Sequence, residues 1–251
     1  MSKAKVMAIA NHKGGVAKTT TAATFGAVLA SMGKKVLLVD LDAQANLTQA
    51  LTAFEPEMTI YDAFKDGQRI DPVAINDNLH LIPSDEEFAT IDLILPGMME
   101  REYRLKDFLS FYLGDYDYIF IDCPPTLGLL LQTALVAADG LIIPTTAEAL
   151  PYKGIKMLMG SLQAVQKRLN PQVKLMAFLV TRYNGRKLNK AVQTYLQTYY
   201  PDIVLQTVIR ENISIAEAPL EHKSIIEYAP TSNGAQDYTA AVKELLARME
   251  G

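Results

Sequence analysis

The chain has 251 residues, with 24 lysines and arginines against 28 aspartates and glutamates and a formal net charge of −4. A hydrophobic fraction of 49% and a charged fraction of 21% are typical of a folded globular protein and exclude disorder as its main state. The single cysteine, Cys123, excludes an intramolecular disulfide framework, and no apolar run reaches the roughly 18 residues that a membrane span needs.

Short apolar runs that are typical of strands alternate along the chain with longer segments of helical period. The predicted strands are residues 6–10, 35–40, 79–83, 118–122, 140–144, 173–181 and 204–209. The predicted helices are residues 19–31, 127–138, 153–169, 188–199 and 233–249. The pattern predicts an α/β fold, a mostly parallel twisted sheet with helices on both faces and ligands at the carboxyl ends of the strands. No linker divides the chain, so we expect one domain over residues 1–251.

A glycine-rich segment joins the first predicted strand to the first predicted helix. Its glycines would let backbone N–H groups surround phosphate oxygens at a helix N-terminus. Lys18 would reach the β- and γ-phosphates, and the Thr19 hydroxyl would ligate Mg²⁺. The general pattern G-x-x-x-x-G-K-[ST] is not matched, because Ala17 stands at its last glycine. The expected nucleotide-binding residues are Lys13, Gly14, Gly15, Val16, Ala17, Lys18, Thr19 and Thr20.

Carboxylates follow two other predicted strands. Asp40 and Asp42 come directly after one buried run, and Asp122 ends another. Side chains at these strand ends would lie near a nucleotide held by the glycine-rich loop, where they could orient Mg²⁺ or an attacking water. We therefore expect Thr19, Asp40 and Asp122 around the metal.

Together these residues resemble the ParA/MinD group of deviant Walker P-loop ATPases over nearly the whole chain. Lys13 stands at the place of the group's signature lysine, residues 40–44 are similar to its D-x-D-x-Q switch, and residues 121–125 to its Walker B strand. Residues 209–212, 217–219 and 232–235 resemble the ParA partition branch.

The resemblance implies ATP and Mg²⁺ as ligands and a homodimer that sandwiches two nucleotides. Lys13 would then cross to the partner's nucleotide, and Gly14 would stay small because two loops face each other. Lys13, Lys18 and Asp42 are the expected catalytic residues, with Asp42 positioning the hydrolytic water. Ala17 departs from the family's glycine; we expect it to be helical, where alanine is harmless.

A basic stretch follows the predicted strand 173–181. Arg182, Arg186, Lys187 and Lys190 occur there without an acidic residue, and Arg210 is a weaker addition. In ParA relatives an arginine at the place of Arg186 contributes to nonspecific DNA binding. The chromosomal partition ATPases commonly have a second basic residue, and this chain has Ser214 at that position. A solvated basic surface is the alternative interpretation.

The resemblance implies a slow ATPase of plasmid or chromosome partition that is cytoplasmic and nucleoid-associated. ATP would drive dimerisation and DNA binding, and a ParB-type centromere-binding partner would stimulate hydrolysis. The alternatives are a nucleoid-bound ATPase that positions a protein cargo, and an ATP-locked switch with negligible turnover. We expect no membrane partner, because the C-terminal helix has balanced charges and is not a basic amphipathic segment.

Overall fold

The computed structural model describes residues 3–146 and 152–250. Within these residues, a seven-stranded sheet has the order β3-β4-β2-β5-β1-β6-β7. All neighbouring strands are parallel except β3 and β4. The strands are β1 (Lys5–Ile9), β2 (Val36–Asp40), β3 (Val73–Asn76), β4 (Leu79–Ile82), β5 (Tyr118–Asp122), β6 (Gly140–Thr146) and β7 (Lys174–Thr181). The predicted α/β fold is confirmed, although β3 was not predicted.

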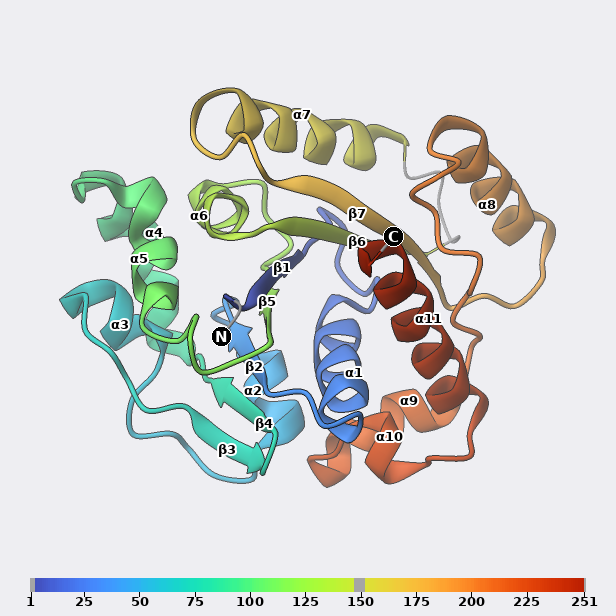
Figure 1. The fold of residues 1–251 in the computed structure, drawn as a ribbon, viewed down its shortest axis with the longest axis horizontal. Coiled ribbons are helices and arrows are strands. Elements are labelled where there is room, and N and C mark those ends of the chain that lie inside the picture. Colours follow the sequence, from blue (N-terminus) through green and yellow to red (C-terminus); the bar gives the residue numbers. More distant parts are fainter. Residues whose placement is uncertain (1–2, 147–151, 251) are drawn as a thin grey trace.

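Helices cover both faces of the sheet (Figure 1). One face packs against α1 and α11, and the other against α5, α6 and α7. The helices in chain order are α1 (Lys18–Ser31), α2 (Asn46–Leu51), α3 (Ile60–Asp66), α4 (Ile91–Ile94), α5 (Arg104–Ser110), α6 (Leu129–Ala137), α7 (Tyr152–Arg168), α8 (Lys187–Tyr199), α9 (Ile213–Glu217), α10 (Ile225–Tyr228) and α11 (Asn233–Glu250). None of the helices in the described part of the chain is long and apolar enough to cross a membrane.

Helix α1 lies unusually close to the sheet. At Gly26, an added Cβ would come within 2.7 Å of Leu38 Cδ2. Phe25, one residue earlier, packs edge-to-face against both Phe120 of β5 and Tyr238 of α11, each with ring centroids 6.1 Å apart. These contacts fix the middle of α1 against the central strands and α11.

The predicted strand 204–209 is not a strand. It runs beside β7, where Leu205 N donates to Phe178 O (3.0 Å) and Ile209 N to Val180 O (2.8 Å). Between these contacts, the backbone N–H groups of Gln206 and Thr207 donate instead to the Glu244 carboxylate of α11, at 2.7 and 2.9 Å. The ladder is interrupted where the partly buried Glu244 carboxylate takes these donors.

The same carboxylate is held from a second side by Arg248, whose Nη2 is 2.6 Å from Glu244 Oε1. Burial alone would raise the pKa of Glu244. The hydrogen bonds from the two backbone N–H groups and the charge of Arg248 outweigh burial and lower that pKa below its ordinary 4.5. Helix α11 thus clamps the segment that enters the functional site.

Candidate nucleotide-binding site

The glycine-rich loop connects β1 to α1 and is anchored to two neighbouring strands. The buried Asn11 side chain donates to Pro144 O of β6 (2.7 Å) and accepts from Lys13 N (3.1 Å). Thr181, at the end of β7, donates its hydroxyl to Val16 O (3.1 Å). The loop is therefore held open at the carboxyl end of the sheet.

Ala17 is the residue at which the loop turns into the helix, and our expectation of a helical conformation is wrong. Its φ of 68° and ψ of 35° are left-handed. Its carbonyl accepts from both Thr21 N (2.9 Å) and Thr21 Oγ1 (2.6 Å), which begins the hydrogen bonding of α1. An L-residue in this conformation costs roughly 1–2 kcal/mol, which glycine avoids because it has no Cβ. The glycine that the family has at this position therefore fits the turn without strain, whereas Ala17 does not.

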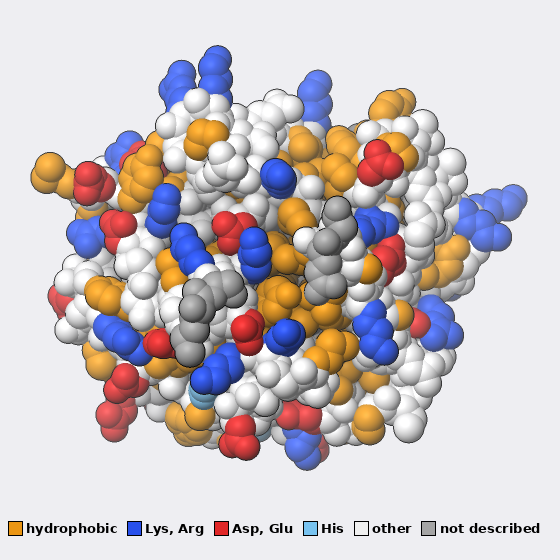
Figure 2. Space-filling model, in the orientation of Figure 1, with side chains coloured by type: hydrophobic (Ala, Val, Ile, Leu, Met, Phe, Trp, Pro, Cys, Tyr) orange, Lys and Arg blue, Asp and Glu red, His pale blue; other side chains and the backbone are white. Residues whose placement is uncertain are grey.

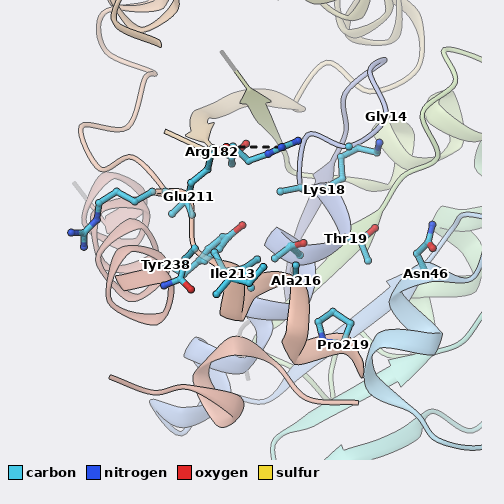
Figure 3. Close-up of a pocket in the computed structure, with 18 of the residues that line it drawn as sticks. Gly14, Lys18, Thr19, Asn46, Arg182, Glu211, Ile213, Ala216, Pro219 and Tyr238 are labelled. Carbon is cyan, nitrogen blue, oxygen red and sulfur yellow. Dashed lines mark ion pairs between the residues drawn. The ribbon is translucent and has the colours of Figure 1, made fainter. Parts of the chain in front are cut away.

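A cleft of about 800 Å³ opens beside the loop (Figure 3). Gly14, Lys18 and Thr19 line one side of it, Asn46 lies at the right in that view, and Pro219 lies at the bottom. The opposite wall comes from residues 209–216, which follow the segment held by Glu244, and from α11. That wall consists of Ile209, Arg210, Glu211, Asn212, Ile213, Ile215, Ala216 and Tyr238.

The two loop lysines have different environments. Lys18 is 8% exposed, and its Nζ donates to the Lys13 carbonyl at 3.4 Å. Lys13 is exposed and is not among the residues that line the cleft. Gly14 is also exposed, and a Cβ built on it meets no atom within 4 Å. Nothing in the described part of this chain therefore requires glycine at position 14.

Asp40 and Asp122 are register partners on the adjacent strands β2 and β5, and both are buried. The hydrogen bonds that Asp40 accepts all come from nearby residues of its own chain. Its Oδ2 accepts from Thr48 N (2.9 Å) and Thr48 Oγ1 (2.8 Å), and its Oδ1 accepts from Asp42 N (3.2 Å). Burial raises the pKa of Asp40 to about 6; these hydrogen bonds oppose the rise, and the nearby Asp42 carboxylate adds to it.

Asp122 has the opposite environment. Neither of its buried carboxylate oxygens has a hydrogen-bond partner. Burial and the neighbouring Asp40 carboxylate raise the pKa of Asp122 well above its ordinary value. The nearby Thr19 hydroxyl and the positive charge of Lys18 act in the opposite direction but are outweighed. A buried carboxylate without donors is suited to a hydrated cation, so Asp122 and the Thr19 hydroxyl fit Mg²⁺. Asp40, which we also expected at the metal, instead accepts three hydrogen bonds from its own chain, and its place at the metal stays a prediction.

Asp42 lines the cleft and is only half-buried. Its Oδ1 accepts from Gln44 N at 3.0 Å, within the turn that leads to α2. The carboxylate thus stands at the edge of the space beside the loop, where a water attacking a terminal phosphate would need a hydrogen-bond acceptor.

The five basic residues predicted to contact DNA have two kinds of surroundings. Arg186, Lys187 and Lys190 are exposed together at the N-terminus of α8. Arg182 instead lines the cleft, with its Nη2 4.0 Å from Glu211 Oε1 (Figure 3). Arg210 also lines the cleft and forms a bidentate pair with Asp237, at 2.9 and 2.7 Å. Their carboxylate partners, Glu211 and Asp237, were not identified from the sequence, where nothing places them beside arginines.

On the face shown in Figure 2, lysine and arginine side chains are spread over many elements and interspersed with acidic ones. This distribution agrees with the net charge of −4. Any contact with a polyanion must therefore rest on a local group of cations.

The AAA domain family model matches residues 4–175. The sporulation initiation inhibitor protein Soj of Bacillus subtilis is 40% identical over 249 residues, covering 97% of this chain and 98% of the relative. The chromosome-partitioning ATPase Soj of Thermus thermophilus is 39% identical over 255 residues, covering 100% and 99%. A solved structure of cobyrinic acid a,c-diamide synthase from Mycobacterium smegmatis, with bound ATP analog and magnesium, superposes with a TM-score of 0.85. It is 32% identical and covers 99% of this chain and 96% of that chain.

Proposed function

The chain belongs to the AAA-domain family of Soj and ParA partition ATPases, and we propose that its ATP cycle drives dimerisation and nonspecific DNA binding. It is an ATPase that uses ATP and Mg²⁺. The observation that carries the proposal is the separation of the two loop lysines. Lys18 is held inside the cleft, whereas Lys13 is exposed outside it.

The cleft residues account for hydrolysis as follows. Loop N–H groups and the Lys18 ammonium hold the β- and γ-phosphates, and Asp42 accepts a hydrogen bond from the attacking water. The water oxygen forms a bond to the γ-phosphorus, the bond from that phosphorus to the β–γ bridging oxygen breaks, and the water's proton ends on phosphate. Thr19 and Asp122 would hold Mg²⁺, which would supply positive charge to neutralise the phosphates.

The second half of the proposal is that two copies share their nucleotides. Lys13 would contact the phosphates of the partner's ATP, and each Gly14 would face the partner's loop. The free space around Gly14 supports this assignment, because any requirement for a small residue there must come from outside this chain. Binding of the dimer to DNA would use Arg186, Lys187 and Lys190, which are free of carboxylate partners among the described residues.

A ParB-type protein is the proposed activator, because stimulation by a partner lets a slow ATPase remain DNA-bound until it meets its cargo. The alternatives differ in cargo or in turnover. A nucleoid-bound ATPase that positions a protein cluster would use the same dimer and the same basic group. An ATP-locked switch is favoured by one observation, the left-handed Ala17 in the phosphate loop.

The decisive experiment measures binding to nonspecific duplex DNA with ATP, with ADP and without nucleotide, each at two salt concentrations. We expect binding with ATP only, and a steep loss of affinity with salt. Lys13→Ala should keep nucleotide binding by the monomer and lose the ATP-dependent dimer in analytical ultracentrifugation. Equal DNA binding in all three nucleotide states, or a dimer that persists in Lys13→Ala, would contradict the proposal.

A further inference from the structure

We propose that Thr48 is a positioning residue for ATP hydrolysis: its hydroxyl fixes the Asp40 carboxylate and, through it, the turn that carries Asp42. The inference rests on the proposed function of the cleft. Thr48 does not line the cleft. It lies in the short helix α2, which follows the turn of residues 40–44, here called the switch turn.

Thr48 joins three separate elements. It is 4% exposed, and its Oγ1 donates to Asp40 Oδ2 at 2.8 Å. The same oxygen accepts from Ser84 N at 2.9 Å, just past the end of β4. The Thr48 backbone N–H donates to Asp40 Oδ2 at 2.9 Å. One hydroxyl therefore ties α2 to the ends of both β2 and β4.

Asp40, held in this way, in turn holds the switch turn. Its other oxygen, Oδ1, accepts from Asp42 N at 3.2 Å. Asp42 in turn accepts from Gln44 N with its side chain (3.0 Å) and from Ala45 N with its carbonyl (2.9 Å). The position of the Asp42 carboxylate thus depends on how the buried Asp40 carboxylate is oriented about its own side-chain torsions.

The hydroxyl is the part of Thr48 that this role requires. Valine has nearly the same shape but neither donates nor accepts, so Thr48→Val would leave Asp40 Oδ2 with the backbone donor alone. Ser84 N–H would also lose its acceptor. A buried carboxylate that loses a donor reorients toward other donors, and a displacement of about 1 Å at a catalytic group can cost about 100-fold in rate.

Thr52 provides a matched control at the C-cap of the same helix. It is also a buried threonine, and its hydroxyl donates to Thr48 O (2.9 Å), but no contact of its side chain with Asp40 occurs in the described structure. Thr52→Val therefore removes a buried hydroxyl one turn away without changing the donors of Asp40. Thr48→Ser keeps the hydroxyl and should rescue the function of the site.

The experiment compares wild type, T48V, T48S and T52V by single-turnover ATP hydrolysis, ATP affinity and hydrogen exchange of the backbone N–H groups of residues 42–46 without nucleotide. For T48V we expect kcat to fall about 10- to 100-fold. ATP affinity should stay within about threefold, and exchange at residues 42–46 should be faster. T48S and T52V should stay within about threefold of wild type in kcat.

The inference is overturned if T48V and T52V lose the same kcat, or if exchange at residues 42–46 is unchanged in T48V. If T48V does not fold, T48S decides: loss of kcat in this variant, which retains the hydroxyl, also overturns it. Failure of the proposed function is distinguishable, because loss of ATP-dependent DNA binding by wild type would appear in the DNA-binding experiment and would leave the comparison of T48V with T52V in ATP hydrolysis unchanged.

Discussion

Replacing Ala17 with glycine should stabilise the protein, which is the reverse of what this substitution does in a helix. Ala17 has a φ of 68°, a conformation that costs an L-residue roughly 1–2 kcal/mol relative to glycine. Glycine also gives the unfolded chain more freedom, which offsets about 0.4–1 kcal/mol of that gain. The net increase in the free energy of unfolding is therefore about 0.5–1 kcal/mol, or about 1–4 °C in Tm for a chain of this size.

The assay is urea and thermal unfolding of the nucleotide-free protein, with Ala191→Gly as the control. Ala191 is exposed within α8 and has a helical backbone, so glycine there should destabilise the protein by about 1 kcal/mol. If both variants lose stability to the same extent, the left-handed conformation stores no strain and our reasoning about Ala17 is refuted. ATP turnover of Ala17→Gly, measured in parallel, tests the ATP-locked alternative: an increase over a negligible wild-type rate would favour it.

Three further predictions address the dimer, the DNA contacts and the clamp on α11. Gly14→Val should abolish the ATP-dependent dimer in sedimentation experiments while the free energy of unfolding of the monomer changes by less than about 0.5 kcal/mol, because a Cβ there meets no atom within 4 Å. The double variant Lys187→Ala, Lys190→Ala should bind DNA more weakly and reduce the slope of log affinity against log salt by about 1.8; an unchanged slope would remove this group from the interface. Glu244→Gln should lower the free energy of unfolding at pH 7 by about 1 kcal/mol, since a partly buried carboxylate with two backbone donors is replaced. Because the pKa of Glu244 is lowered by folding, its contribution is present above about pH 4.5 and is lost as pH falls through the folded value. Unfolding titrations of wild type should therefore show an acid dependence that this variant lacks.

The sequence was sufficient for the parallel core of the sheet and for the loop that binds phosphate. Buried strands in such a sheet are short continuous apolar runs, and residues 36–39 and 118–121 show this pattern between turn residues. The antiparallel edge strand β3 was missed because its residues alternate between half-buried and exposed and carry no strong apolar signal. The hydrophobic periodicity of a sequence indicates which residues are buried. This signal is weakest in a strand such as β3, which is only partly buried.

The errors at 204–209 and at Ala17 have a different origin. The first segment has the apolar residues of a strand, but its backbone donors are taken by Glu244, which lies 38 residues further along the chain from Gln206. At Ala17 a residue with high helix propensity adopts a left-handed conformation because the loop must turn into α1 there. At 204–209 a distant residue overrides a local preference, whereas at Ala17 the adjacent loop-to-helix turn overrides helix propensity.

The same limit explains why the two buried carboxylates could not be told apart. Asp40 and Asp122 each end an apolar strand, and they face each other in register on β2 and β5. Their donors differ completely: Asp40 accepts from Thr48 and Asp42, whereas no hydrogen bond to Asp122 is present in the described structure. The donors of Asp40 come from residues 42 and 48, so only the conformation of the switch turn assigns them.

This difference divides the work of the site between the two strands. A carboxylate that accepts three hydrogen bonds from its own chain can hold a turn, and a carboxylate without donors retains its capacity for a hydrated cation. We therefore propose that Asp40 acts on the position of Asp42 and that Asp122 acts with Thr19 on the metal. The Asp40 carboxylate raises the pKa of Asp122 across the register pair, and a cation bound beside Asp122 would therefore favour the ionised form of both neighbouring carboxylates.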